Sequence, residues 1–164
     1  MGYFFLPLLV IAHWFFGSAR GKRMALDASV SVGIALLINI LIGLLWQHPR
    51  PFMVPVGHTL LSHGADSSFP SDHLAVAFAV SFSFIAASRT VQGILLCGVS
   101  LAIAWARIYL GVHFPIDIVG SAVVALAGVY LCQRNNQSVN KVYILLERIY
   151  IALFSLAIKK GIFR

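Results

Sequence analysis

The chain has 164 residues, of which 60% are hydrophobic and 10% are charged, and its formal net charge is +7. Soluble domains average roughly 45–50% apolar and about 25% charged residues, so this composition excludes an ordinary soluble domain and indicates exposure to lipid. The basic excess does not indicate nucleic-acid binding, because the Lys and Arg residues form no aromatic-interleaved motif and most lie just outside apolar stretches.

Five apolar stretches predict membrane helices, because a spanning helix needs roughly 20 apolar residues. The stretches cover residues 3–16, 28–46, 74–87, 91–106 and 116–132. The first, about 14 residues long, is shorter than a comfortable span, which indicates either a short helix or a missing preceding helix. A sixth stretch, 142–158, contains Glu147 and Arg148 and favours an interfacial amphipathic helix. We expect an all-α, polytopic membrane helix bundle with about five transmembrane helices plus a C-terminal amphipathic or sixth helix, forming one domain over residues 1–164.

The basic residues predict how the chain lies in the membrane. Ten of the twelve fall on one side, which the positive-inside rule assigns to the cytoplasm, together with a basic tail at 133–164. These ten are Arg20, Lys22, Arg23, Arg89, Arg134, Lys141, Arg148, Lys159, Lys160 and Arg164. The opposite side holds the titratable groups that could do chemistry: Arg50, Arg107, Asp66, Asp72, Asp117, His48, His58, His63, His73 and His113.

Arg107, His113 and Asp117 form a polar cluster between the fourth and fifth stretches. Gly111 and Pro115 break the helix there, and Pro115 suits the first turn of the next helix, which puts Asp117 in that turn. A carboxylate within reach of an imidazole fixes its tautomer and directs the other ring nitrogen outward as a nucleophile or base. Alternatively, Asp117 caps a helix N-terminus and His113 is an interfacial polar residue.

A second cluster, at residues 70–73, stands directly before the third stretch. Ser71 is expected to be the N-cap of that helix. Free backbone N–H groups at a helix N-terminus form a phosphate seat, to which a serine hydroxyl adds a donor. His73 would then stand beside a bound phosphate and donate a proton to a leaving oxygen. An ordinary capped helix with a surface histidine is the alternative.

Two arginines favour the phosphate interpretation. Guanidinium groups at membrane depth are costly unless an anion pairs with them, so Arg50 and Arg107 together indicate a phosphate. We therefore expect an active site built from segments 47–73 and 105–117. His63 and Asp66 fit two interpretations equally well, as groups that assist the substrate or as part of a hydrogen-bonded loop scaffold.

Three motifs resemble those of the type 2 phosphatidic acid phosphatase superfamily, whose signatures are Lys-x6-Arg-Pro, Pro-Ser-Gly-His and Ser-Arg-x5-His-x3-Asp. In this chain they read Gly-x6-Arg-Pro at 43–51, Pro-Ser-Asp-His at 70–73 and Ala-Arg-x5-His-x3-Asp at 106–117. The resemblance implies that His113 is the nucleophile, Asp117 its orienting carboxylate and His73 the general acid. The residues expected to bind phosphate are Arg50, Ser71, Asp72 and Arg107.

Three positions depart from the family pattern, because Gly43 replaces the lysine, Asp72 the glycine and Ala106 the serine. The first departure removes a phosphate ligand. The string A-D-S-S-F-P-S-D-H at 65–73 resembles the bacterial undecaprenyl-diphosphatases associated with bacitracin resistance, a subgroup that also lacks the lysine.

The resemblance thus implies hydrolysis of undecaprenyl diphosphate to undecaprenyl phosphate and phosphate through a phosphohistidine, which recycles the cell-wall carrier lipid. Phosphatidylglycerol phosphate and phosphatidic acid are alternative substrates, and a non-catalytic protein that binds or transports lipid phosphates is an alternative function. A site with both a nucleophile and an acid favours the enzyme. No metal or cofactor is expected. The expected partners are the lipid substrate and membrane lipids, and the expected location is the bacterial cytoplasmic membrane, with the site facing the periplasm or cell exterior.

Overall fold

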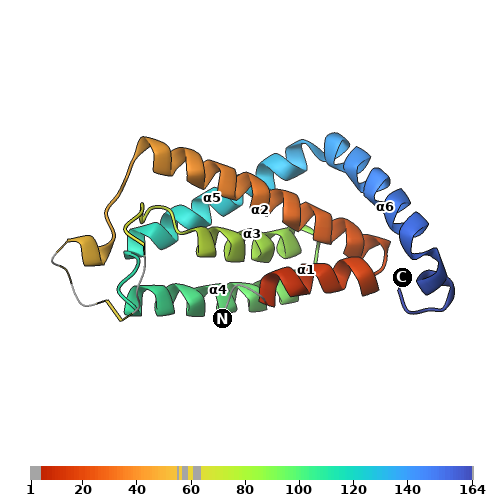
Figure 1. Ribbon diagram of the computed structural model, residues 1–164, viewed down its shortest axis with the longest axis horizontal. Helices are drawn as coiled ribbons and strands as arrows, with labels where there is room; N and C mark the ends of the chain where they lie inside the picture. The colour runs from red at the N-terminus through yellow and green to blue at the C-terminus, as the bar shows by residue number, and fades with distance from the viewer. Residues whose placement is uncertain (1–4, 55, 57–58, 61–63, 164) are drawn as a thin grey trace.

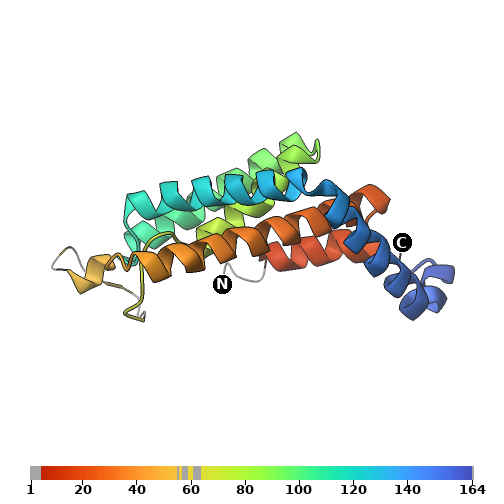
Figure 2. The same cartoon turned by 90° about the horizontal axis from the view of Figure 1, so that it is seen from above.

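The computed structural model describes residues 5–54, 56, 59–60 and 64–163. Within these residues the chain forms α1 (Phe5–Phe16), α2 (Ala19–Leu45), the short 3-10 helix η1 (Pro51–Met53), α3 (Asp72–Ala86), α4 (Thr90–Tyr109), α5 (Pro115–Arg134) and α6 (Asn136–Lys159). Helices α1 to α5 lie side by side in one elongated bundle, and α6 leaves it obliquely at one end (Figures 1 and 2). The predicted all-α helix bundle is confirmed.

The apolar helices match the five predicted stretches. Among the described residues, α2, α4 and α5 are long and apolar enough to cross a membrane, while α1 and α3 are shorter apolar helices. The sixth stretch lies within helix α6, which extends beyond it at both ends. α6 is not among the described helices that are long and apolar enough to cross a membrane. This agrees with the amphipathic character expected from its charged residues.

The start of α2 differs from the prediction. The apolar stretch begins at residue 28, whereas the helix begins at Ala19, where the Ser18 hydroxyl accepts a hydrogen bond from the Gly21 N–H at 3.4 Å. Arg20, Lys22 and Arg23 therefore lie within the helix and not in a connection. Hydropathy detects the apolar centre of a helix, and the charged first turns were missed for that reason.

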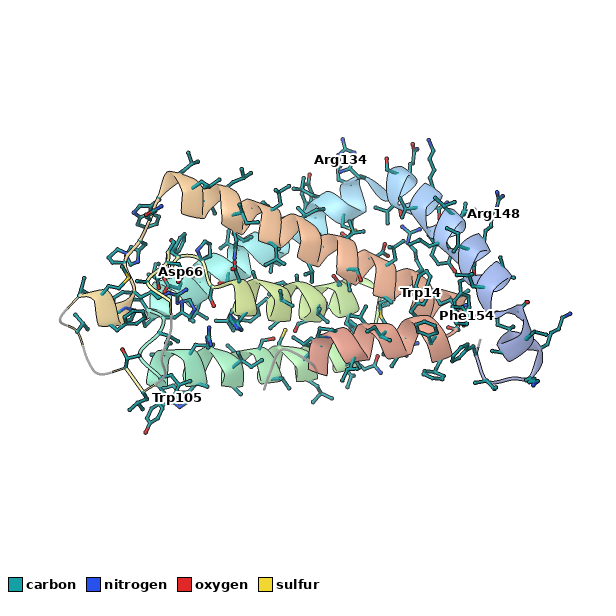
Figure 3. The ribbon with its side chains drawn as sticks, viewed as in Figure 1. Trp14, Asp66, Trp105, Arg134, Arg148 and Phe154 are labelled. Carbon is teal, nitrogen blue, oxygen red and sulfur yellow. The ribbon has the colours of Figure 1, made fainter. Side chains whose placement is uncertain are left out.

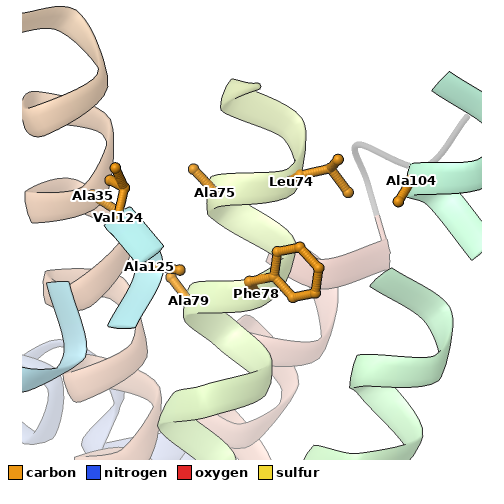
Figure 4. Close-up of a cluster of buried hydrophobic side chains, with 8 residues drawn as sticks. All are labelled: Ala35, Leu74, Ala75, Phe78, Ala79, Ala104, Val124 and Ala125. Atoms are coloured by element: carbon orange, nitrogen blue, oxygen red, sulfur yellow. The ribbon is translucent and has the colours of Figure 1, made fainter. Parts of the chain in front are cut away.

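The core is built from small side chains around α3. Ala75 and Ala79 of α3 face Ala35 of α2 and Ala125 of α5, while Phe78 points toward α4 (Figure 4). Small residues let helix backbones approach closely, which is the main packing device available where lipid is as apolar as the side chains. α3 is thereby fixed between α2, α4 and α5, and its N-terminus is held at the end where the three motifs meet.

The basic residues divide between the two ends of the bundle. The chain enters α2, leaves α3, enters α4 and leaves α5 at the end from which α6 departs (Figure 1). This end carries the described members of the basic group, whereas Arg50 and Arg107 lie at the other end, where α2 and α4 finish. The histidines His58 and His63 fall outside the described residues.

α5 packs tightly against α2 at Gly128. A Cβ atom there would lie 2.5 Å from the Ser31 carbonyl oxygen and 3.3 Å from the Ala35 Cβ, whereas a Cβ atom at Gly98 would meet nothing within 4 Å. We expect Gly128→Ala to destabilise the bundle by about 1–3 kcal/mol, because the backbones must separate. Gly98→Ala is the matched control and should be neutral or stabilising by up to about 1 kcal/mol through helix propensity. The thermal unfolding midpoint in detergent measures both, and equal shifts would contradict the close approach.

Candidate active site

The turn between α4 and α5 fixes the position of His113. Gly111 has a positive φ of 71°, its N–H donates to the Ile108 carbonyl at 2.9 Å, and the Val112 N–H donates to the Arg107 carbonyl at 3.2 Å. These two bonds form a Schellman motif, in which the residue after the C-cap takes the left-handed conformation that glycine adopts without strain. The helix therefore ends abruptly and turns His113 back toward the bundle.

Asp117 holds the imidazole of His113 in one orientation. The His113 Nδ1 lies 3.1 Å from the Asp117 Oδ2, and the same oxygen accepts the Phe114 N–H at 2.8 Å and the hydroxyl of Ser68. Both His113 and Asp117 are buried, at 3% and 0% exposure. An ionised carboxylate only accepts hydrogen bonds, so Nδ1 carries the proton and Nε2 keeps its lone pair.

The lone pair of His113 Nε2 faces hydrogen-bond donors. The Ser71 Oγ is 3.1 Å from Nε2 and the Arg50 Nη1 is 3.4 Å from it. A hydroxyl and a guanidinium at this atom would also reach the oxygens of a phosphoryl group bonded to it. The predicted nucleophile and two of the predicted phosphate ligands are thus brought together.

Arg50 is held rigidly from three directions. Its Nε donates to the Asp66 carboxylate at 2.8 Å, its Nη1 to the Val112 carbonyl at 2.9 Å and its Nη2 to the Ser67 carbonyl at 3.2 Å. The residue is only 5% exposed. The second N–H of Nη1 faces the His113 Nε2, beside the second N–H of Nη2, and a guanidinium edge of this kind forms bidentate contacts with a phosphate.

His73 and Arg107 form the other side of the site. The Arg107 Nη2 lies 3.1 Å from the His73 Nδ1. A guanidinium can only donate, so the His73 Nδ1 accepts, and the ring proton sits on Nε2. The buried Nε of Arg107 has no partner among the described residues. A buried charged donor without an acceptor is costly, and an anion would satisfy it.

Ser71 and Asp72 differ in part from what the sequence predicts. Ser71 does stand at the N-cap position of α3, but its hydroxyl makes no capping hydrogen bond and contacts His113 instead. The Ser71 carbonyl accepts the Ser121 hydroxyl at 2.9 Å, which links the start of α3 to α5. Asp72 accepts a hydrogen bond from Asn39 at 2.8 Å, so the contact that holds this carboxylate is to α2. Its role in binding phosphate stays a prediction.

The segment before α3 makes two contributions; the sequence interpretation missed Ser68 and left Asp66 open between assisting the substrate and a hydrogen-bonded loop scaffold. Ser68, which is fully buried, donates to the carboxylate that orients His113, and Asp66 accepts from Arg50. Their position immediately ahead of the Pro70–His73 motif was the available signal, but periodicity does not reveal long-range hydrogen bonds made by a loop. Asp66 is thus joined to the site, whereas His63 lies outside the described residues.

A cavity of about 500 Å³ lies beside this cluster. Gly43, at the position of the family lysine, lines it, and among the described residues a Cβ atom there would have only the Ser67 Cβ nearby, at 3.8 Å. Leu44 also lines the cavity and is 73% exposed, and the adjacent Leu45 is 88% exposed. Because glycine stands where the family has lysine, the cavity keeps open space here, next to the exposed Leu44 and Leu45.

Burial lowers the pKa of His113 below its ordinary value; the hydrogen bond to Asp117 opposes this shift, and the charge of Arg50 adds to it. The imidazole is therefore unprotonated near neutral pH, as a nucleophile requires. No group of three or more potential metal-ligating side chains occurs in the part of the chain that the structure describes.

The family model of the PAP2 superfamily matches residues 24–141, which include all three motifs. The chain belongs to the PAP2 superfamily. It is 34% identical to YbjG of Escherichia coli K12 over 157 residues, and 37% identical to the undecaprenyl-diphosphatase BcrC of Bacillus subtilis 168 over 153 residues. These alignments cover 95% and 93% of this chain and 79% of each relative.

Further comparisons give another relative and two solved structures with the same fold. The bacitracin transport permease protein BcrC of Bacillus licheniformis is 29% identical over 75% of this chain and 61% of its own length. Two solved structures share the fold: LpxE of Aquifex aeolicus, with a TM-score of 0.67 and 24% identity, and a PAP2-type phosphatidylglycerolphosphate phosphatase of Bacillus subtilis, with a TM-score of 0.58 and 22% identity. Each covers 82% of this chain, and this chain covers 78% and 70% of them.

The surroundings of His113 predict two opposite shifts in its titration. We expect the imidazole to titrate below the ordinary value of about 6.5 in NMR spectra of histidine-labelled protein. Asp117→Asn removes an attraction for the imidazolium and should lower this pKa further, whereas Arg50→Gln removes a repulsion and should raise it. The spectrum of His113→Ala assigns the signal. A wild-type value above 6.5, or shifts of the same sign in both variants, would contradict the described environment.

Proposed function

We propose that this protein is a membrane lipid phosphatase that removes the terminal phosphate of undecaprenyl diphosphate through a phosphohistidine intermediate. The observation that carries the proposal is the environment of His113, in which Nδ1 is bonded to the buried Asp117 carboxylate and the lone pair of Nε2 faces Ser71 and Arg50. A nucleophile with fixed tautomer and donors around the reacting atom is what phosphoryl transfer needs.

In the first step, Nε2 of His113 attacks the terminal phosphorus, and the bond between that phosphorus and the bridging oxygen breaks. Undecaprenyl phosphate departs and takes a proton from Nε2 of His73 in its imidazolium form, which requires that Arg107 turn from the His73 Nδ1 to the bound phosphate and that Nδ1 hold a proton. The phosphohistidine that remains carries a positive ring, which the ionised Asp117 stabilises. The single step thus forms one N–P bond and breaks one P–O bond.

In the second step, a water molecule attacks the phosphohistidine, gives a proton to His73 and releases inorganic phosphate. His113 and His73 both return to their starting protonation states, so the cycle is balanced. Arg50, Arg107 and Ser71 stabilise the charge on the three equatorial oxygens in both steps. Because Arg50 is held by three protein acceptors, its donors need little rearrangement as this charge develops.

The substrate assignment is supported by the relatives. The undecaprenyl-diphosphatase BcrC of Bacillus subtilis is 37% identical to this chain, and the alignment covers 93% of it. Other family members have a lysine at the position of Gly43. The space that its absence leaves can hold the second phosphate of a diphosphate headgroup next to the transferred one. The Bacillus licheniformis relative is named a transport permease protein, so transport is a second candidate function. An assay of phosphate release distinguishes the two functions, because only hydrolysis releases phosphate.

We further propose that the site faces the periplasm or cell exterior of a bacterial cytoplasmic membrane. The end of the bundle opposite the site carries the basic residues of α2 and α6, and short connections with excess Lys and Arg stay in the cytoplasm. A site on the outer face would act on a carrier lipid after the carrier has delivered its cargo.

We expect His113→Ala to abolish phosphate release, because no other described group at the site can replace the nucleophile. Purified protein would be assayed with EDTA on undecaprenyl diphosphate, phosphatidylglycerol phosphate and phosphatidic acid, and wild type should also give an acid-labile labelled phosphoenzyme. His13→Ala, which removes an α1 histidine bonded to the Leu9 carbonyl, is the matched control and should retain activity. Phosphate release by His113→Ala would refute the mechanism, and inactivity of wild type on every lipid would favour transport.

The proposed orientation predicts which ends of the chain react with an impermeant thiol reagent. In a protein with Cys97 and Cys132 replaced by Ala, Val56→Cys in the outer loop should be labelled on intact cells, because Val56 is 55% exposed. Gln137→Cys in the first turn of α6 should be labelled only after the cells are opened. The reverse pattern would overturn the orientation and leave the histidine chemistry untouched.

A further inference from the structure

Helix α6 presents charged residues on one side. Lys141 and Arg148 are seven residues apart, close to two helical turns, and Lys159 follows near the C-terminal end of the helix. All three are exposed, and we call them the basic stripe. Figure 3 shows Arg148 directed away from the bundle, with Phe154 and Trp14 close together between α6 and α1. Non-helical backbone at Phe154 bends α6 between the last two members of the stripe.

Another side of α6 is apolar and uncovered. Leu145, Ile149, Leu153 and Leu156 recur at the three- and four-residue spacing of one helix face, and their exposed fractions are 58%, 45%, 72% and 74%. Such a face is unfavourable in water but suits the boundary between headgroups and acyl chains, where an amphipathic helix lies with its basic residues toward the headgroups.

An apolar groove runs beneath α6. It has a volume of about 440 Å³ and is lined by Trp14 of α1, Leu26 of α2 and Leu153 of α6, among others. The ring of Tyr150 packs against Trp14 at a centroid distance of 6.2 Å, and the Lys22 ammonium lies 3.9 Å from the centroid of the same Tyr150 ring. The groove is thus apolar enough to accept a hydrocarbon chain, and the buried Lys22 stands against the Tyr150 ring that lines it.

The charge around the groove is strongly one-sided. Among the described residues, the α6 end of the bundle has nine basic side chains against two acidic ones, Asp27 and Glu147. Asp27 is already paired with Arg23 at 2.9 Å. An anionic surface attracts such a cluster, whereas a zwitterionic surface does not.

We propose that the groove under α6 is a binding site for an anionic phospholipid of the leaflet opposite the candidate active site. One acyl chain lies in the groove, and the exposed basic stripe contacts its headgroup and neighbouring anionic headgroups. The groove and the charges are complementary to this lipid in shape and in sign. This site is separate from the candidate active site and does not depend on the proposed function.

The fluorescence of Trp14 can report which lipid occupies this groove. It has three tryptophans, and only Trp14 lines the groove, so Trp46→Phe with Trp105→Phe leaves a single reporter. The variant would be reconstituted in phosphatidylcholine vesicles that contain a minor fraction of brominated phosphatidylglycerol or, in parallel, the same fraction of brominated phosphatidylcholine. Bromine quenches tryptophan only at short range, so quenching reports which lipid occupies the groove.

We expect several-fold stronger quenching by the brominated anionic lipid, and a smaller difference in high salt because the attraction is screened. Lys141→Gln, Arg148→Gln and Lys159→Gln together should remove the difference, whereas Arg89→Gln, a basic residue at the same end outside α6, should keep it. Equal quenching by the two lipids would overturn the headgroup preference. Quenching by neither would show that a second copy or another protein covers the groove, which also overturns the proposal.

Discussion

One buried carboxylate organises the end of the bundle where the motifs meet. A single oxygen of Asp117 accepts from the His113 ring, the Phe114 backbone and the Ser68 hydroxyl. A buried ionised group that loses its donors is strongly destabilising, so geometries that misplace any of the three are disfavoured. The α4–α5 turn, the start of α5 and the segment before α3 are therefore held in one arrangement by one atom.

The positions of Arg50 and Arg107 depend on the arrangement around Asp117. The Val112 carbonyl that receives Arg50 belongs to the same turn that ends in His113, so Arg50 and His113 cannot shift independently. Arg107 lies in the last turn of α4, and its contact with His73 joins that helix to the first turn of α3. The small residues that pack around α3 keep these helix ends from moving apart.

The sequence correctly predicted those helices and turns whose conformation is determined by residues close to them in the chain. The apolar stretches matched helices, and the Gly111 and Pro115 signals correctly indicated an abrupt turn before Asp117, because backbone conformation depends on neighbouring residues. Asn39, a polar residue inside the apolar stretch 28–46, bonds across helices to Asp72, as polar residues inside membrane helices commonly do. The direction of the Ser71 hydroxyl and the contacts of Ser68 and Asp66 were not predictable, because they depend on segments brought together only by the folded bundle. The start of α2 was missed because its first turns are charged.

The exposed leucines at the end of α2 have a consequence for how a lipid reaches this site. Leu44 and Leu45 face outward only five or six residues before Arg50, and Trp46, an aromatic residue of the kind found at membrane boundaries, follows them. The hydrocarbon layer therefore extends almost to Arg50. A membrane lipid can slide sideways into position with its tail still dissolved among its neighbours, and no energy is spent on lifting the chain into water. A water-soluble phosphate ester has no hydrocarbon tail in the membrane that would hold it beside the site.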